Sequence, residues 1–154
     1  MNHFIYCTPK GRLTIAADNQ GITEIHFGVM ELPMDYAPSA LTNRAATEIQ
    51  EYFAGKRTTF DIPLHPQGTP FQLEVWAELQ NIPYGKTVTY ADIAALLGKP
   101  KSYRAVGSAN NKNPIPILIP CHRVIGANGS LTGYASGLKI KKYLLDLEAR
   151  YVKQ

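Results

Sequence analysis

The stretch Asn113-Pro-Ile-Pro-Ile-Leu-Ile-Pro-Cys-His-Arg-Val124 places reactive side chains directly after an apolar run. Prolines at positions 114, 116 and 120 restrict the backbone and disfavour helix at the residues before them. We therefore expect an extended segment that holds Cys121 and His122 in fixed positions. A thiol is a weak nucleophile unless a base or a cation lies nearby, and His122 and Arg123 are candidates for both. A buried, inert cysteine at the end of a core strand is the alternative interpretation.

The composition describes a water-soluble globular chain. Its 154 residues, 45% of them hydrophobic, suffice for one ordinary domain or two small ones. No apolar run approaches the ~18 residues of a membrane helix, and the first ten residues do not form a signal peptide. The two cysteines, Cys7 and Cys121, are too few for a disulfide framework or a zinc finger. We expect reduced thiols, a cytoplasmic location, no membrane partner, and neither a metal nor a cofactor.

The charge is distributed unevenly along the chain. Residues 1–70 contain 5 lysines and arginines and 7 acidic residues, a net charge of −2. Residues 71–154 contain 11 lysines and arginines and 5 acidic residues, a net charge of +6. A basic half indicates a polyanionic partner such as nucleic acid. A soluble domain that is basic for unrelated reasons is the alternative.

The first part of the chain has the pattern of a small α/β domain. Alternating apolar residues predict three antiparallel strands around residues 4–6, 13–16 and 22–27. Apolar residues at helical spacing predict a helix over 39–53, and residues 58–62 are expected to form one more strand. Three prolines and a glycine within residues 63–70 indicate a linker.

The second part predicts mostly helices. Thr69-Pro-Phe-Gln72 and Thr89-Tyr-Ala-Asp92 are helix-capping signals, and a further helix is expected over 102–110. The last two form a helix-turn-helix pattern. Small residues give the helix over 102–110 a bare surface from which Arg104 projects, which suits a helix that enters a groove; close helix packing is the alternative. The residues that form this surface are Ala105, Gly107, Ser108 and Ala109.

A last helix is expected from Leu138 to about Tyr151. Glu148 lies one turn after Leu144 on its inward face. A buried carboxylate needs a partner, and we expect that partner to be a histidine.

Residues 113–124 resemble the signature of the O6-alkylguanine-DNA alkyltransferases, the methylated-DNA–protein-cysteine methyltransferase family. The resemblance continues through Tyr84-Gly85, Thr87–Tyr90, Arg104–Gly107 and Gly133-Tyr134, and covers residues 71–154. It implies a ribonuclease-H-like α/β domain over 1–62, a linker over 63–70, and a helical domain of winged-helix-like or helix-turn-helix type over 71–154. Asp18 and Thr23 stand where some members have zinc ligands, so no zinc site is expected.

The resemblance also implies roles in catalysis. Cys121 would be the nucleophile, and His122 would act as its base through a bridging water. Glu148 would hold His122, and this charged pair would depress the pKa of the thiol. Asn113 would brace the turn around the cysteine. Tyr90 would contact the DNA and donate a hydrogen bond to the departing guanine.

The implied partner is double-stranded DNA that contains alkylated bases, bound by a monomer. Arg104 would fill the gap left when the damaged base is flipped out, with Gly107 and Ser108 beside it. Tyr134 and Val124 would line the pocket for that base. The alkyl group, from methyl to bulkier groups, would move once from O6-alkylguanine to the protein, and O4-alkylthymine is a second candidate substrate.

Three other functions fit parts of the pattern. Alkyltransferase-like proteins bind such lesions without chemistry, but they lack the cysteine that stands here at position 121. A cysteine hydrolase would need an oxyanion-hole motif, and none is evident. A zinc deaminase would need a second cysteine at position 124, where this chain has valine.

Overall fold

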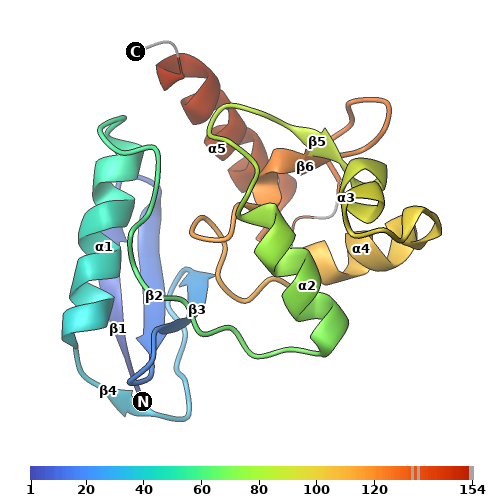
Figure 1. Cartoon of the computed structure of the whole chain (residues 1–154). Helices are drawn as coiled ribbons and strands as arrows, with labels where there is room; N and C mark the ends of the chain where they lie inside the picture. The colour runs from blue at the N-terminus through green and yellow to red at the C-terminus, as the bar shows by residue number, and fades with distance from the viewer. Residues whose placement is uncertain (133, 135, 153–154) are drawn as a thin grey trace. The chain divides into compact units, whose positions relative to one another are not determined.

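The computed structural model describes residues 1–132, 134 and 136–152, which fall into two compact units. The units are Met1–Gln67 and Gly68–Gln154, and each is described by itself (Figure 1). The first residues of the segment expected as a linker, 63–70, form backbone hydrogen bonds within the first unit. There the N–H of Ile22 donates to the carbonyl of Pro63 at 2.9 Å, and the N–H of His65 donates to the carbonyl of Ile22 at 2.8 Å.

A four-stranded sheet in the order β3-β2-β1-β4 forms the base of the first unit. Its strands are β1 (Asn2–Thr8), β2 (Gly11–Ala17), β3 (Ile22–Phe27) and β4 (Asp35–Tyr36). The first three are antiparallel, whereas β4 runs parallel to β1. Gly11 turns the first hairpin with a φ of +107°, and Asp18 closes the second by accepting from the N–H groups of Gln20 and Gly21. The predicted three-stranded meander is confirmed.

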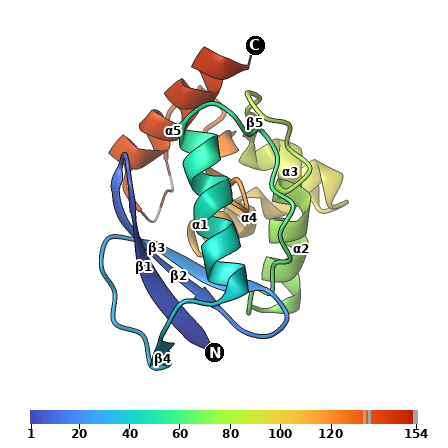
Figure 2. The same cartoon turned by 90° about the vertical axis from the view of Figure 1, so that its left-hand side faces the viewer.

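Helix α1 (Ala40–Phe53) packs on one face of this sheet (Figure 2). A capping box starts it: Ser39 Oγ accepts from the N–H of Thr42, and Thr42 Oγ1 accepts from the N–H of Ser39. Ile49 and Tyr52 are fully buried on its inner side. The helix predicted for residues 39–53 is confirmed, because its apolar residues recur at the spacing that one buried helix face requires.

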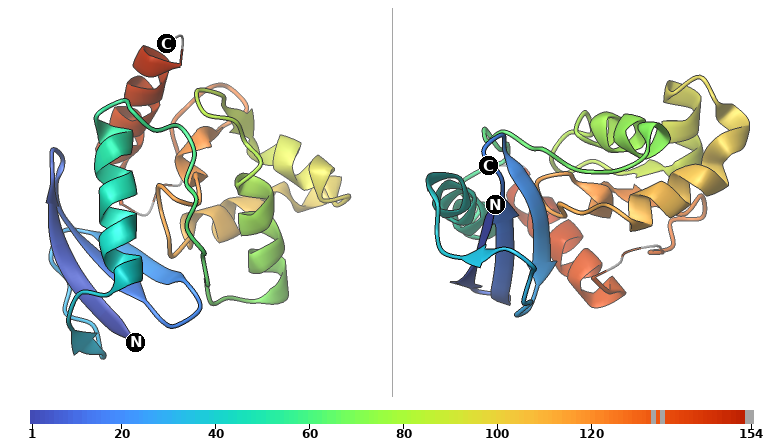
Figure 3. Two further views of the ribbon diagram at one scale, coloured as in Figure 1. Left: turned by 60° about the vertical axis from the view of Figure 1, so that its left-hand side comes forward. Right: turned by 90° about the horizontal axis from the view of Figure 1, so that it is seen from below.

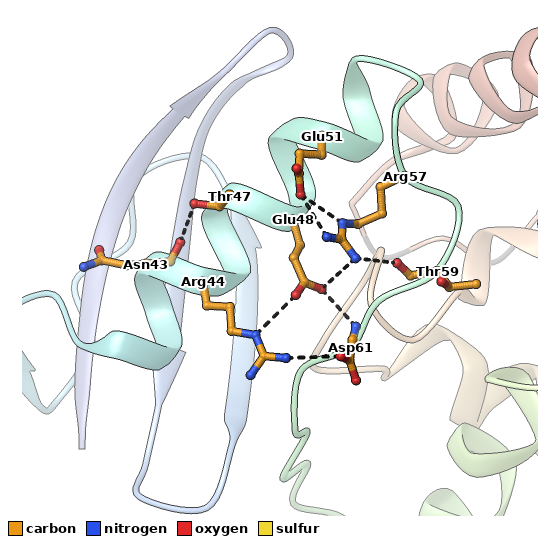
Figure 4. Close-up of polar contacts among 8 residues, drawn as sticks. All are labelled: Asn43, Arg44, Thr47, Glu48, Glu51, Arg57, Thr59 and Asp61. Carbon is orange, nitrogen blue, oxygen red and sulfur yellow. Dashed lines mark hydrogen bonds and ion pairs between the residues drawn. The ribbon is translucent and has the colours of Figure 1, made fainter.

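The segment after α1 is not the strand that we expected over residues 58–62. Its polar groups bind side chains of α1 instead of a neighbouring strand (Figure 4). The carboxylate of Glu48 accepts from the N–H of Asp61 at 3.0 Å. Glu48 also pairs with Arg44 at 3.3 Å and with Arg57 at 3.7 Å, although it is only 5% exposed. The strand prediction was wrong because this buried carboxylate supplies the hydrogen bond that a strand partner would have supplied.

The second unit is mainly helical. Its helices are α2 (Pro70–Leu79), α3 (Tyr90–Leu96), α4 (Tyr103–Asn111) and α5 (Leu138–Tyr151), with short 3₁₀ turns at Pro100–Ser102 and Cys121–Arg123. The strands β5 (Val88–Thr89) and β6 (Val124–Ile125) form a parallel pair. Both predicted capping boxes are present, so the starts of α2 and α3 are confirmed. In the part of the chain that the structure describes, no helix is long and apolar enough to cross a membrane.

Helices α3 and α4 form the predicted helix pair, and α2 packs against both of them (green to gold in Figure 3). The buried Trp76 of α2 donates its indole N–H to the carbonyl of Ala109 in α4 at 2.9 Å. This bond fixes α4 to the core on one side. Arg104, Ala105 and Ser108 of the same helix are exposed.

Candidate active site

The segment before Cys121 forms a tight turn, so the extended geometry that we expected was wrong. The N–H of Ile119 donates to the carbonyl of Ile115 at 2.9 Å, and Ile117 between them has a φ of +74°. β-branched residues rarely adopt that left-handed region. Asn113 binds both ends of the turn, with Nδ2 donating to Ile119 and Oδ1 accepting from Ile115. A proline restricts its own backbone and that of the residue before it. Ile117 comes after Pro116 and before a leucine, so neither restriction applies to its φ and ψ angles.

Cys121 begins the 3₁₀ turn and is only 4% exposed. Burial raises the pKa of its thiol to about 11, because a thiolate loses its hydration there. A hydrogen bond from Asn113 and the charge of Lys141 oppose this rise without cancelling it. We expected the His122–Glu148 pair to depress this pKa. That expectation was wrong, since the imidazole of this pair is neutral.

The predicted contact between His122 and Glu148 is confirmed. Nε2 of His122 lies 2.6 Å from Oε2 of Glu148, and both side chains are buried. Burial, together with the charges of Arg123 and Lys141, lowers the pKa of His122 by more than Glu148 raises it, so the ring is neutral at physiological pH. Because Nε2 donates to the carboxylate, Nδ1 carries no proton, and none of the described residues hydrogen-bonds to it. The pair therefore offers a buried nitrogen that can accept a proton.

Glu148 has more donors than the sequence indicated. Arg123 donates through Nε at 2.9 Å and through Nη2 at 3.0 Å, and the N–H of Gly85 donates at 3.0 Å. Burial alone would raise the pKa of Glu148, but His122 and Arg123 outweigh it and lower the pKa to about 2. Arg123 also donates to the carbonyl of Ile82 at 2.7 Å. We expected Arg123 as a cation beside the thiol. It neutralises the carboxylate of Glu148 instead.

Lys141 of α5 is a buried cation that sequence reasoning missed. Its side chain is fully buried, and its Nζ donates to the carbonyls of Val124 at 2.5 Å and Thr132 at 2.6 Å. Burial lowers the pKa of Lys141 to about 8, against the opposing influence of Cys121. The signal was its position seven residues before Glu148, on the helix face already assigned to the core.

The two tyrosines expected around the substrate lie near the cysteine and its loop. Tyr134 is 7% exposed, its hydroxyl has no hydrogen-bond partner among the described residues, and burial together with Cys121 raises its pKa well above the ordinary value. The hydroxyl of Tyr90 donates to the carbonyl of Thr132 at 3.0 Å. Val124 is fully buried in β6.

Helix α4 exposes most of the surface that we expected to be bare. Arg104 and Ser108 are exposed, and Gly107 is partly buried beside the ring of Tyr90, which would lie 3.7 Å from a Cβ at that position. Ala109 is buried, so its assignment to the exposed surface was wrong. Helical geometry turns that residue toward α2.

Asp18 and Thr23, where we expected no zinc site, differ in their surroundings. The carboxylate of Asp18 lies 2.5 Å from Nδ1 of His65, and Thr23 is buried. Within the residues that the structure describes, no group of three or more potential metal ligands is present.

Comparison with known proteins covers both units. Residues 70–150 match the profile of the 6-O-methylguanine DNA methyltransferase DNA binding domain, and residues 1–66 match that of its ribonuclease-like domain. The methylated-DNA–protein-cysteine methyltransferase of Methanosarcina acetivorans is 48% identical over 153 residues, which cover 96% of this chain and 98% of that protein. The constitutive Bacillus subtilis protein of the same name is 46% identical over 159 residues, covering 96% of each chain.

Solved structures agree with these sequence matches. The crystal structure of Mycobacterium tuberculosis OGT in complex with DNA has a TM-score of 0.90 and 41% identity, and the match covers 98% of this chain and 94% of that one. The O6-methylguanine DNA methyltransferase from Methanococcus jannaschii has a TM-score of 0.70 and 30% identity, with 94% and 92% covered. The predicted fold class, a ribonuclease-like α/β part followed by a helical DNA-binding part, is confirmed. The chain belongs to the 6-O-methylguanine DNA methyltransferase family, also called the methylated-DNA–protein-cysteine methyltransferases.

Proposed function

We propose that this protein repairs alkylated DNA by direct reversal, transferring the alkyl group from O6 of guanine to its own Cys121. The observation that carries the proposal is a buried thiol directly followed by a neutral, carboxylate-anchored His122. The basic charge of the same unit and its family profile support DNA as the partner. Because the protein is itself the final acceptor, each molecule acts once.

The chemical step is a displacement at the alkyl carbon. Cys121 Sγ forms a bond to that carbon while the bond from carbon to O6 breaks, and its electron pair returns to the guanine. The thiol proton passes through a bridging water to Nδ1 of His122, and Glu148 stabilises the imidazolium that forms. Tyr90 donates a hydrogen bond to the departing guanine, which requires its hydroxyl to leave Thr132.

Recognition requires the damaged base to leave the stack, since a buried thiol cannot reach O6 inside a duplex. We assign the gap-filling role to Arg104, with Gly107 and Ser108 lying against the DNA. Tyr134 and Val124 form walls of the pocket that receives the base. Their burial near the cysteine supports that assignment.

We assign catalysis and DNA binding to residues 71–154 and infer that residues 1–62 form a separate folding unit, joined by residues 63–70. The protein acts as a monomer, because one chain holds every side chain that the mechanism uses. We infer a cytoplasmic location, since Cys121 must remain reduced to react.

Intact-mass measurement after mixing the protein with a duplex that contains O6-methylguanine tests the proposal. We expect a gain of one methyl group, located on Cys121 by peptide mapping. Cys7→Ala should react like the wild type, and Cys121→Ala should bind the duplex without gaining mass. A methyl group on Cys7, or lesion binding by the wild type without transfer, would refute the assignment; the second result would identify a lesion-binding protein instead.

A further inference from the structure

The side-chain amide of Asn110 is buried against the backbone of the nucleophile. Asn110 belongs to α4 and is 1% exposed. Its Nδ2 donates to the carbonyl of Cys121 at 3.4 Å. This contact decides which arm of the amide carries the nitrogen, because an oxygen in that place would face the carbonyl oxygen. Oδ1 lies on the other arm, and no donor among the described residues hydrogen-bonds to it.

A buried acceptor without a donor is costly, so its retention in a folded protein needs an explanation. Other acceptors around Cys121 are in use. The backbone carbonyls of Ile119 and Val124 accept from side chains at 2.8 Å and 2.5 Å. Nδ1 of His122 is also without a partner among the described residues, but the proposed mechanism uses it for the thiol proton. Oδ1 of Asn110 is therefore the acceptor that the chemical step leaves for the substrate.

O6-alkylguanine offers one kind of donor to such an acceptor. The alkyl group on O6 leaves N1 without a proton, so the 2-amino group carries the only N–H bonds of this base in DNA. Enzymes that take a base out of the stack read it through hydrogen bonds to its Watson–Crick edge, where the 2-amino group lies. O4-alkylthymine has no N–H group. An acceptor beside Cys121 thus favours the guanine lesion over the thymine lesion.

We propose that Oδ1 of Asn110 accepts a hydrogen bond from the 2-amino group of the flipped O6-alkylguanine, which makes Asn110 a specificity-determining residue. The inference rests on the proposed function, because it takes Cys121 as the group that receives the alkyl carbon. Cys121 is 4% exposed, so the base that reaches its thiol enters a site as deeply buried as Asn110. One amide then holds the backbone of the nucleophile through Nδ2 and reads the base through Oδ1.

Two duplexes that differ only in the 2-amino group test the inference. One contains O6-methylguanine and the other O6-methylhypoxanthine, each opposite cytosine. We expect the wild type to transfer methyl from the second duplex about 10-fold more slowly, the effect of one hydrogen bond. Asn110→Leu should react with both duplexes at rates within about twofold of each other. Asn111→Leu is the matched control, since Asn111 is exposed on the same helix, and it should keep the wild-type ratio.

The ratio of the two rates separates base reading from a structural role. Loss of packing around Cys121 would slow both duplexes together and leave the ratio unchanged. The 2-amino group also affects pairing within the duplex, but that effect is the same for every variant and cancels when their ratios are compared.

Two results would overturn the inference: a wild type that reacts equally fast with both duplexes, or an Asn110→Leu protein that is folded by circular dichroism and keeps the wild-type ratio. Asn110→Ala removes the same oxygen without adding a branched side chain, and it gives the same comparison if the leucine variant does not fold. Both results leave methyl transfer from O6-methylguanine to Cys121 intact. A wild type that gains no methyl group would instead refute the proposed function.

Discussion

At the scale of single residues, the carboxylate of Glu148 holds the site together. It accepts hydrogen bonds from His122, Arg123 and the backbone of Gly85. We predict that Glu148→Gln lowers the free energy of unfolding by roughly 3 kcal/mol, because it leaves the buried guanidinium of Arg123 without a counter-charge. Alkyl transfer should slow by about 10-fold or more, since the imidazolium that forms during reaction loses its partner. Urea unfolding and single-turnover rates measure the two effects.

The control for this substitution lies half a turn away on α5. Asp146 is exposed and pairs only with a surface lysine among the described residues, so Asp146→Asn should change stability by less than about 0.5 kcal/mol.

The dependence of stability on acid pH gives a second test of Glu148. The pKa of Glu148 falls from 4.5 to about 2 in the folded protein, so its contribution to stability is present above pH 4.5 and is lost as the pH falls toward 2. Equal acid sensitivity in wild type and Glu148→Gln would contradict this account.

At the scale of secondary-structure elements, the proposed function assigns DNA binding to α4 and the chemical step to the residues around Cys121. Its inner side is bonded to α2 through Trp76, and Arg104 is exposed on the helix. We predict that Arg104→Ala slows repair of O6-methylguanine in duplex DNA by about 10-fold, because unstacking a base costs a few kcal/mol and part of the compensation is lost. Reaction with free O6-benzylguanine should change little, since a free base needs no flipping. Second-order rate constants on both substrates make the comparison.

We predict a different result for Tyr90→Phe, a substitution in the neighbouring helix α3. The hydroxyl of Tyr90 is assigned to the leaving guanine, so its loss should slow both substrates. Equal losses on both substrates for Arg104→Ala would instead make that arginine a structural residue.

At the scale of the whole molecule, the basic charge predicts how the protein finds DNA. The chain has a formal net charge of +4, and residues 71–154 alone carry +6. Binding through phosphates should weaken by about 100-fold between 50 and 200 mM salt if about four phosphates are neutralised. Two undamaged duplexes of unrelated sequence should bind alike, because phosphate contacts carry no sequence information. Fluorescence anisotropy titrations check both statements, and salt-independent binding would count against a phosphate-based interface.

Much of the fold was predictable from local signals. The capping boxes at Thr69 and Thr89 placed the starts of α2 and α3, because a cap depends on residues three positions apart. The pairing of Glu148 with a histidine followed from a carboxylate on an apolar helix face. The strand expected over 58–62 does not form. The backbone N–H of Asp61 in this segment donates to the carboxylate of Glu48 in α1, which is not a strand neighbour.

The sequence by itself determined the family, the three-stranded meander, the main helices, and the candidate nucleophile with its histidine and carboxylate. Most of these depend on residue types and on local patterns, which the chain shows directly. Tertiary structure alone decided the turn at Ile117, the partners of Lys141 and the protonation of the site. The raised pKa of Cys121 and the neutral ring of His122 follow from burial. Burial is set by residues far apart in the chain, so hydration and charge at the nucleophile become defined only when those residues pack around it.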